Sequence, residues 1–196
     1  MNIDWIKKRK LLVILLFITI ISFLFGSLFI SILSDNNQVL VKESIISYFN
    51  GIKTGDFTYL KSLYSILSSN LIIALFIWIM GISIIGILLV VLLLIYYSFI
   101  TGFSLVSILY TYGFKGILVS IIYMIPEVIN LFVLFVLSYY SISFSILLFN
   151  YLFRKKDINR KVVVARYLKY LIISLGIFII TSFISVFVIP NILKFF

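Results

Sequence analysis

The sequence contains no cysteine and no histidine, and it has only six acidic residues in 196. Without cysteine and histidine the chain has no disulfides, no thiol nucleophile, no His-assisted serine chemistry and none of the usual zinc or haem ligand sets. A hydrolase would have to work with carboxylates or Ser/Lys pairs alone. We therefore expect a protein that is not an enzyme and that carries no cofactor and no metal.

Charge is scarce and apolar residues dominate. Charged residues make up 11% of the chain and hydrophobic residues 64%, with a mean hydropathy of +1.29. Ordinary soluble chains are about half apolar and about a quarter charged. The composition predicts an all-α, multi-pass protein of the cell membrane. The net charge of +10 is then explained by basic loops that set the topology, and no nucleic-acid partner is expected.

Five apolar stretches predict about five transmembrane helices in a single membrane domain. Each is long enough to cross a hydrocarbon core of about 30 Å. Basic residues gather before the first stretch and between the fourth and fifth, and the positive-inside rule places both groups in the cytoplasm, with the N-terminus inside and the C-terminus outside. The predicted spans are 11–34, 70–87, 89–112, 117–149 and 168–190, the last ending at Pro190.

Two polar stretches separate these spans. The first, residues 35–69, is expected to be an outer loop with two short amphipathic helices, the second with Asp56 as its N-cap. This loop is the best surface for partner proteins outside the cytoplasm. The second, residues 150–167, is a basic inner loop. It serves as a topology anchor, with binding of anionic lipid head groups as the alternative.

Glu127 is the only charged residue in 117–149, and it follows Pro126 near the middle of that stretch. An acid inside a membrane costs roughly 2.5 to 3.5 kcal/mol. Asn130 lies three residues later on the same helical face. These residues could form a polar contact inside the bundle or with a partner span, or a protonated Glu127 could cap backbone groups freed by Pro126. Pro126 is expected to bend or break this span.

Two pairs of small residues have the spacing that lets helices approach closely. They are Ser22 with Gly26, and Ser98 with Gly102. Packing within the chain is favoured over a dimer face. Three serines alternate in the fourth span, so no helical face collects all of them, and no role is assigned to them: Ser141, Ser143 and Ser145.

Residues 68–149 carry a series of marks in otherwise apolar sequence. They are an Asn entering a span, two later glycines, a glycine in the next span, a Gly-x-x-Gly turn and a proline in the fourth span: Asn70, Gly81, Gly86, Gly102, Gly113, Gly116 and Pro126. This pattern resembles the stage II sporulation protein M family. Many members have His directly after the proline and an acid one turn later, whereas here Glu127 and Asn130 take these places.

The resemblance implies a non-enzymatic scaffold in the mother-cell membrane during endospore formation. Its partners would be membrane lipids and two membrane-anchored proteins that degrade peptidoglycan, a hydrolase and a lytic transglycosylase, which drive engulfment of the forespore. Whether the chain forms a homo-oligomer is left open by the sequence. The alternative is transport, either as a permease subunit that pairs with a separate ATPase or as a small ion-coupled carrier that uses Glu127.

Overall fold

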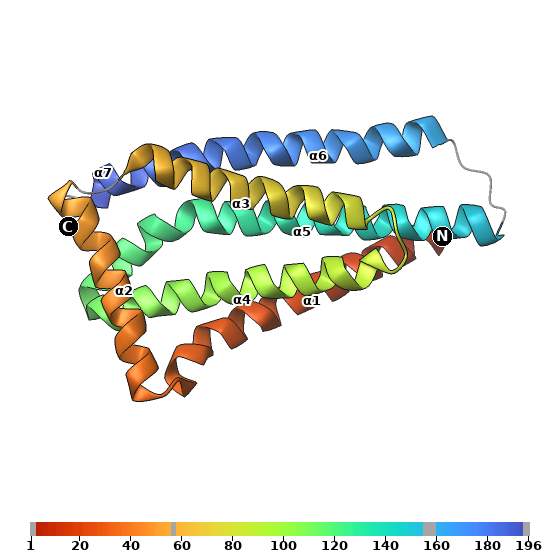
Figure 1. The fold of residues 1–196 in the computed structure, drawn as a ribbon. Coiled ribbons are helices and arrows are strands. Elements are labelled where there is room, and N and C mark those ends of the chain that lie inside the picture. The colour runs from red at the N-terminus through yellow and green to blue at the C-terminus, as the bar shows by residue number, and fades with distance from the viewer. Residues whose placement is uncertain (1–2, 56–57, 155–159, 194–196) are drawn as a thin grey trace.

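The structure is a computed structural model that describes residues 3–55, 58–154 and 160–193. Within these residues the chain is helical and contains no strand, as the composition predicts (Figure 1). The elements in chain order are α1 (Ile3–Ile32), α2 (Asp35–Thr54), α3 (Tyr59–Met80), α4 (Gly86–Tyr112), the 3-10 turn η1 (Gly113–Lys115), α5 (Gly116–Arg154), α6 (Arg160–Phe183), the π-helix η2 (Ile184–Val188) and α7 (Ile189–Leu193).

The long helices α1, α3, α4, α5 and α6 run along one bundle, and α2 lies across one end of it (Figure 1). We call that end the α2 end. The start of α1, the α3–α4 turn, the end of α5 and the start of α6 lie at the opposite end. We call this the basic end, because its helices carry Arg9, Lys10, Lys161, Arg166 and Lys169. The two groups of basic residues therefore lie at one end, and the assignment of that end to the cytoplasm stays a prediction.

The helices are long and apolar enough to cross a membrane. Four segments meet this criterion within the described residues: Arg9–Ile32, Tyr59–Met80, Gly86–Phe153 and Lys161–Leu193. The third contains both α4 and α5, so four to five long helices could span a bilayer. Large apolar side chains on α1, such as Phe17 and Phe25, are 60% and 65% exposed. Such exposure is compatible with a multi-pass membrane protein, in which outward apolar side chains face lipid.

Helix α3 begins eleven residues before the predicted span start at 70, and it ends at Met80 rather than at 87. The second amphipathic pattern of the outer loop is thus the first part of α3 and not a separate surface helix. Neither Gly nor Pro interrupts the chain between Tyr59 and Met80, so a helix once started continues. Helix α2 does lie in the loop and ends at Gly55 in the left-handed conformation. Asp56, the expected N-cap, falls outside the described residues.

Helix α5 passes through Pro126 without a break and contains 39 residues, which corresponds to roughly 58 Å. The part of α5 nearest α2 is inclined to the rest, which fits a bend rather than a break (Figure 1). Helices α5 and α6 also extend into the predicted inner loop, because α5 ends at Arg154 and α6 begins at Arg160. The stretch of this loop that remains between them, residues 155–159, lies outside the described residues.

The last helix also continues past Pro190, where the fifth span was predicted to end. The N–H of Ile189 bonds the carbonyl of Ile184, five residues back, so the turn before the proline is a π-helix. A wider turn of this kind leaves room for the proline ring, which lacks an N–H to donate. Helix α7 therefore follows directly and reaches Leu193.

Two apolar cores hold the bundle together. The larger is in the middle of the long helices and is made of Leu15, Ala74, Ile77, Val90, Leu94, Val133, Leu134, Leu137, Ile142 and Phe178. The smaller attaches α2 to the bundle and is made of Phe49, Ile52, Ile108, Val119, Ile189 and Leu193. The second core places α2 against α4, α5 and α7, close to the polar residues described next.

Candidate functional site

Glu127 lies in the half of the bundle next to α2, and not at the middle of its helix. It comes eleven residues after the start of the 39-residue α5. Its side chain is partly buried, and its carboxylate accepts a hydrogen bond of 3.0 Å from the hydroxyl of Tyr97 on α4. Glu127 thus joins two helices through a side-chain partner, as expected of a polar contact inside the bundle.

Asn130 lies one turn further along α5 and is fully buried. Its amide oxygen accepts a hydrogen bond of 2.5 Å from the hydroxyl of Thr181 on α6. Its amide nitrogen has no hydrogen-bond partner among the described residues. The two polar residues of α5 therefore turn to different neighbours, Glu127 to α4 and Asn130 to α6.

Asn70 extends this arrangement to α3. It is buried near the middle of α3, not at the entrance of a span, and its amide lies 3.5 Å from the hydroxyl of Ser182. Ser182 follows Thr181 directly on α6. Side-chain hydrogen bonds thus run from α4 to α5, from α5 to α6 and from α6 to α3. We call this set the polar belt: Tyr97, Glu127, Asn130, Thr181, Ser182 and Asn70.

Aromatic residues of α2 lie next to the polar belt. The ring of Tyr48 is 6.1 Å from the ring of Tyr123 on α5, and Phe49 is 5.4 Å from Tyr112. Burial raises the pKa of the Tyr48 phenol, and the charge of a deprotonated Glu127 raises it further, so the phenol stays neutral near pH 7. Helix α2 therefore brings a second tyrosine within electrostatic reach of Glu127.

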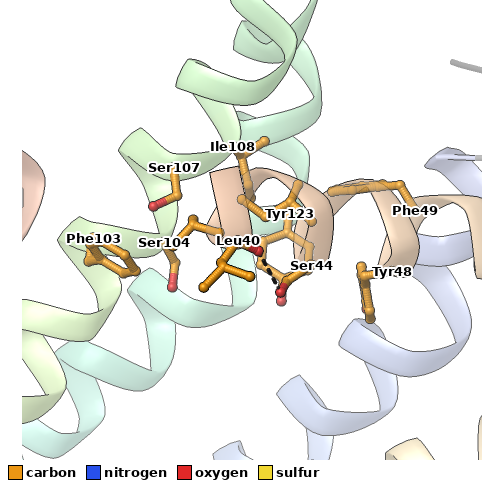
Figure 2. A pocket seen from close by; sticks show the side chains of 11 residues that line it. Leu40, Ser44, Tyr48, Phe49, Phe103, Ser104, Ser107, Ile108 and Tyr123 are labelled. Atoms are coloured by element: carbon orange, nitrogen blue, oxygen red, sulfur yellow. Dashed lines mark hydrogen bonds between the residues drawn. The ribbon is translucent and has the colours of Figure 1, made fainter. Parts of the chain in front are cut away.

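A groove of about 390 Å³ opens between α2, α4 and α5 beside this cluster. We call it the α2 groove. Its lining includes Leu40 and Ser44 of α2, Phe103 and Ser107 of α4, and Tyr123 of α5 (Figure 2). The Ser107 side chain is buried, and its hydroxyl has no hydrogen-bond partner in the part of the chain that the structure describes. The groove is mostly apolar, with a few hydroxyls.

Gly81 and Gly86 frame the turn between α3 and α4 at the basic end. A Cβ atom on Gly81 would collide with the Tyr167 hydroxyl and with Ser141, and one on Gly86 would collide with the carbonyl of Met80. Both positions therefore require glycine. Neither belongs to the polar belt, which lies nearer the α2 end.

The serines of α5 that were given no role hold this turn. Ser141 and Ser145 are four residues apart and so share one helical face, although Ser143 does not. Ser141 donates to the carbonyl of Ile77 at 3.0 Å, and Ser145 donates to the carbonyl of Ser83 at 2.8 Å. Tyr167 on α6 donates to the carbonyl of Trp78 at 2.5 Å. We call Ser141, Ser145 and Tyr167 the turn clamp.

The paired small residues pack α1 against α4 within the chain. A Cβ on Gly26 would meet the carbonyl of Phe99, and one on Gly102 would meet the carbonyl of Phe23. The backbones are therefore in direct contact at both glycines, as the small-x-x-x-small spacing predicts. Gly102 thus acts in packing and lies apart from the polar belt.

Of the predicted site residues, the structure brings Asn70, Asn130 and Glu127 into one belt, with Pro126 buried beside them. Sequence reasoning missed the partners of these residues: Tyr97, Thr181 and Ser182. The adjacent Thr181 and Ser182 in the apolar stretch 175–184 were a signal, because hydroxyl side chains join helices in membranes. No comparable signal marked Tyr97 on α4, because the chain has 13 tyrosines and nothing in the pattern distinguishes one of them.

Comparison with known proteins adds one finding. A family model described as stage II sporulation protein M matches residues 13–190. No curated protein and no solved structure matches the chain. The family match spans nearly the whole chain and includes the segment 68–149, whose glycines, Asn70 and Pro126 carry the resemblance. The chain therefore belongs to the stage II sporulation protein M family.

Proposed function

We propose that this chain is a non-enzymatic membrane scaffold that positions peptidoglycan-degrading partners during engulfment of the forespore. Membership of the family supports an association with sporulation and with a membrane. The scaffold role and the two partners, a hydrolase and a lytic transglycosylase, come from the family resemblance. The observation that favours this function is that the polar side chains of the bundle form hydrogen bonds with one another across helices.

These side chains bind one another across helices. Glu127 accepts from Tyr97, Asn130 accepts from Thr181, and Asn70 contacts Ser182. The middle of the bundle is filled by apolar side chains that are fully or almost fully buried: Leu94, Leu134, Leu137 and Phe178. The amide nitrogen of Asn130 has no partner among the described residues, but each of these polar side chains contacts a neighbouring helix within a packed interior. Such contacts favour a structural membrane protein over a carrier, whose ionisable residue would face a water-filled path.

Helix α2 is the surface that we assign to partners. Phe49 and Ile52 are buried against the bundle, whereas Val39 and Leu40 are 52% and 60% exposed. An exposed apolar strip beside a groove is suited to the membrane-proximal segment of an anchored partner. Under the predicted topology α2 lies outside the cytoplasm, on the side where peptidoglycan is found.

The test is a clean deletion in the source organism, which is then induced to sporulate and imaged with a membrane dye. The expected phenotype is arrest with a flat or bulging septum and an unengulfed forespore. Complementation with Leu40→Asp should fail, and pull-down of the peptidoglycan-degrading partners should be lost. Leu152→Asp changes an exposed leucine at the basic end and should complement. Normal engulfment in the deletion strain would overturn the proposal and favour the alternative, a transport function.

A further inference from the structure

A second pocket lies near the basic end, between α5 and α6, away from the polar belt and the α2 groove. Its volume is about 310 Å³, which is within the range of small-ligand sites. Four tyrosines, one serine and one arginine supply its polar groups: Tyr139, Tyr140, Tyr167, Tyr170, Ser143 and Arg166. No acidic residue is among the described residues that line it. We call it the tyrosine pocket.

Arg166 supplies the charge of the tyrosine pocket. In residues 3–55, 58–154 and 160–193, the structure gives its guanidinium no ion pair. A guanidinium presents a planar set of donors that matches the oxygens of a phosphate or a carboxylate. The exposed Arg166 side chain therefore gives the pocket a positive charge that the described chain does not neutralise.

Two hydroxyls add to this donor set. Tyr140 donates to the Tyr170 hydroxyl at 2.5 Å, which leaves the proton of Tyr170 free for another acceptor. The hydroxyl of Ser143 is buried and has no hydrogen-bond partner among the described residues. One cationic residue and two residues with available hydroxyl protons thus line one cavity, which favours an anion with several acceptor oxygens as its ligand.

The position of the pocket indicates where this anion comes from. Arg166 is six residues from the start of α6, or roughly 9 Å along the helix. Tyrosine and tryptophan favour the depth of lipid head groups, and Trp78 stacks on Tyr167 beside the pocket. Apolar side chains, Phe144, Leu147 and Val163, form the remaining wall. A charged mouth beside apolar walls suits a phospholipid, which joins a phosphate to acyl chains.

We propose that the tyrosine pocket binds the phosphate group of an anionic phospholipid at the basic end of the bundle. Arg166 holds the phosphate oxygens, and Tyr170 and Ser143 donate hydrogen bonds to them. This site does not depend on the scaffold function, because it uses neither α2 nor the polar belt. It converts a general attraction of basic residues to the membrane surface into one defined site between two helices.

The experiment is native mass spectrometry of the full chain in detergent, with phosphatidylglycerol as the probe and phosphatidylcholine as the neutral comparison. The wild type should retain phosphatidylglycerol in preference. Arg166→Gln should weaken this retention about fivefold or more, the value of one basic residue at an anionic surface. Lys169→Gln is the matched control, because Lys169 is on the same helix, carries the same charge and does not line the pocket.

Two further conservative variants separate the remaining outcomes. Tyr170→Phe retains the ring and should reduce retention, whereas Arg166→Lys retains the charge without the planar fork and should reduce it less than Arg166→Gln. Equal losses in Arg166→Gln and Lys169→Gln would overturn the proposal in favour of diffuse surface attraction. Equal retention of phosphatidylcholine would also overturn it. Displacement of the lipid by inorganic phosphate alone would assign the site to a free anion instead.

Discussion

The hydroxyl of Tyr97 on α4 donates a hydrogen bond of 3.0 Å to the carboxylate of Glu127 on α5. The two residues are 30 positions apart in the chain, and this bond joins the two helices that flank η1. Glu127 is the only acidic residue in 117–149. Among the described residues, its carboxylate has the hydroxyl of Tyr97 as a hydrogen-bond partner. Satisfying a polar group in this way reduces the cost of inserting it.

The first prediction concerns this bond. Glu127→Leu should lose function in a complementation assay, whereas Glu127→Gln should keep most of it, because the amide oxygen can still accept from Tyr97. The matched variant Tyr97→Phe removes the same bond, and in the double variant with Glu127→Leu it should add little further loss. The bond itself should contribute about 0.6 to 1.7 kcal/mol to stability. Full activity of Glu127→Leu would remove Glu127 from the site.

The second prediction concerns the contact between α1 and α4. Gly102→Ala should lower the free energy of unfolding by about 1 to 3 kcal/mol, because the added methyl group would meet the backbone of α1 at Phe23. The control is Gly176→Ala on α6, where a Cβ would meet nothing within 4 Å. That change should be neutral or raise stability by about 0.5 to 1 kcal/mol. Thermal unfolding in detergent measures both, and equal effects would contradict close packing at Gly102.

The third prediction concerns the turn clamp. Tyr167→Phe removes a hydrogen bond of 2.5 Å to the carbonyl of Trp78 and a contact of 3.0 Å with the hydroxyl of Ser141. The turn between α3 and α4 should then be cut faster by an added protease, since its opening costs less free energy. Tyr96→Phe changes a tyrosine that is 58% exposed and should leave the rate unchanged. If both variants are cut at the wild-type rate, the hydroxyl of Tyr167 does not hold the turn.

Much of the architecture was accessible from composition and periodicity. The all-α class, the long apolar helices and the amphipathic helix after the first span follow from runs of apolar residues, and no other chain segment is needed to recognise them. Helix ends were harder. The ends at Met80 and Arg154 depend on which turns pack against neighbouring helices, and Pro190 is accommodated by a π-helix that no sequence signal announced.

The candidate site likewise contains residues that the sequence identified and partners that it did not. Glu127, Asn130 and Asn70 were recognisable because a polar side chain in an apolar run is costly and so must have a partner. Which partner each one takes was not recognisable, because Tyr97, Thr181 and Ser182 are 30 to 112 positions away in the chain. The serines at 141 and 145 were set aside for a related reason, since their acceptors are carbonyls of α3 and of the α3–α4 turn.

The amino-acid order alone was thus sufficient for the membrane class, the approximate number of spans, the glycines where helices approach and the polar residues that need a partner. These properties arise from local composition and from spacing along one helix. The pairing of those polar residues, the attachment of α2 across one end and the tyrosine pocket required the folded chain. Each of them joins residues that only the packing of separate helices brings together, and that packing depends on the shapes of many side chains at once.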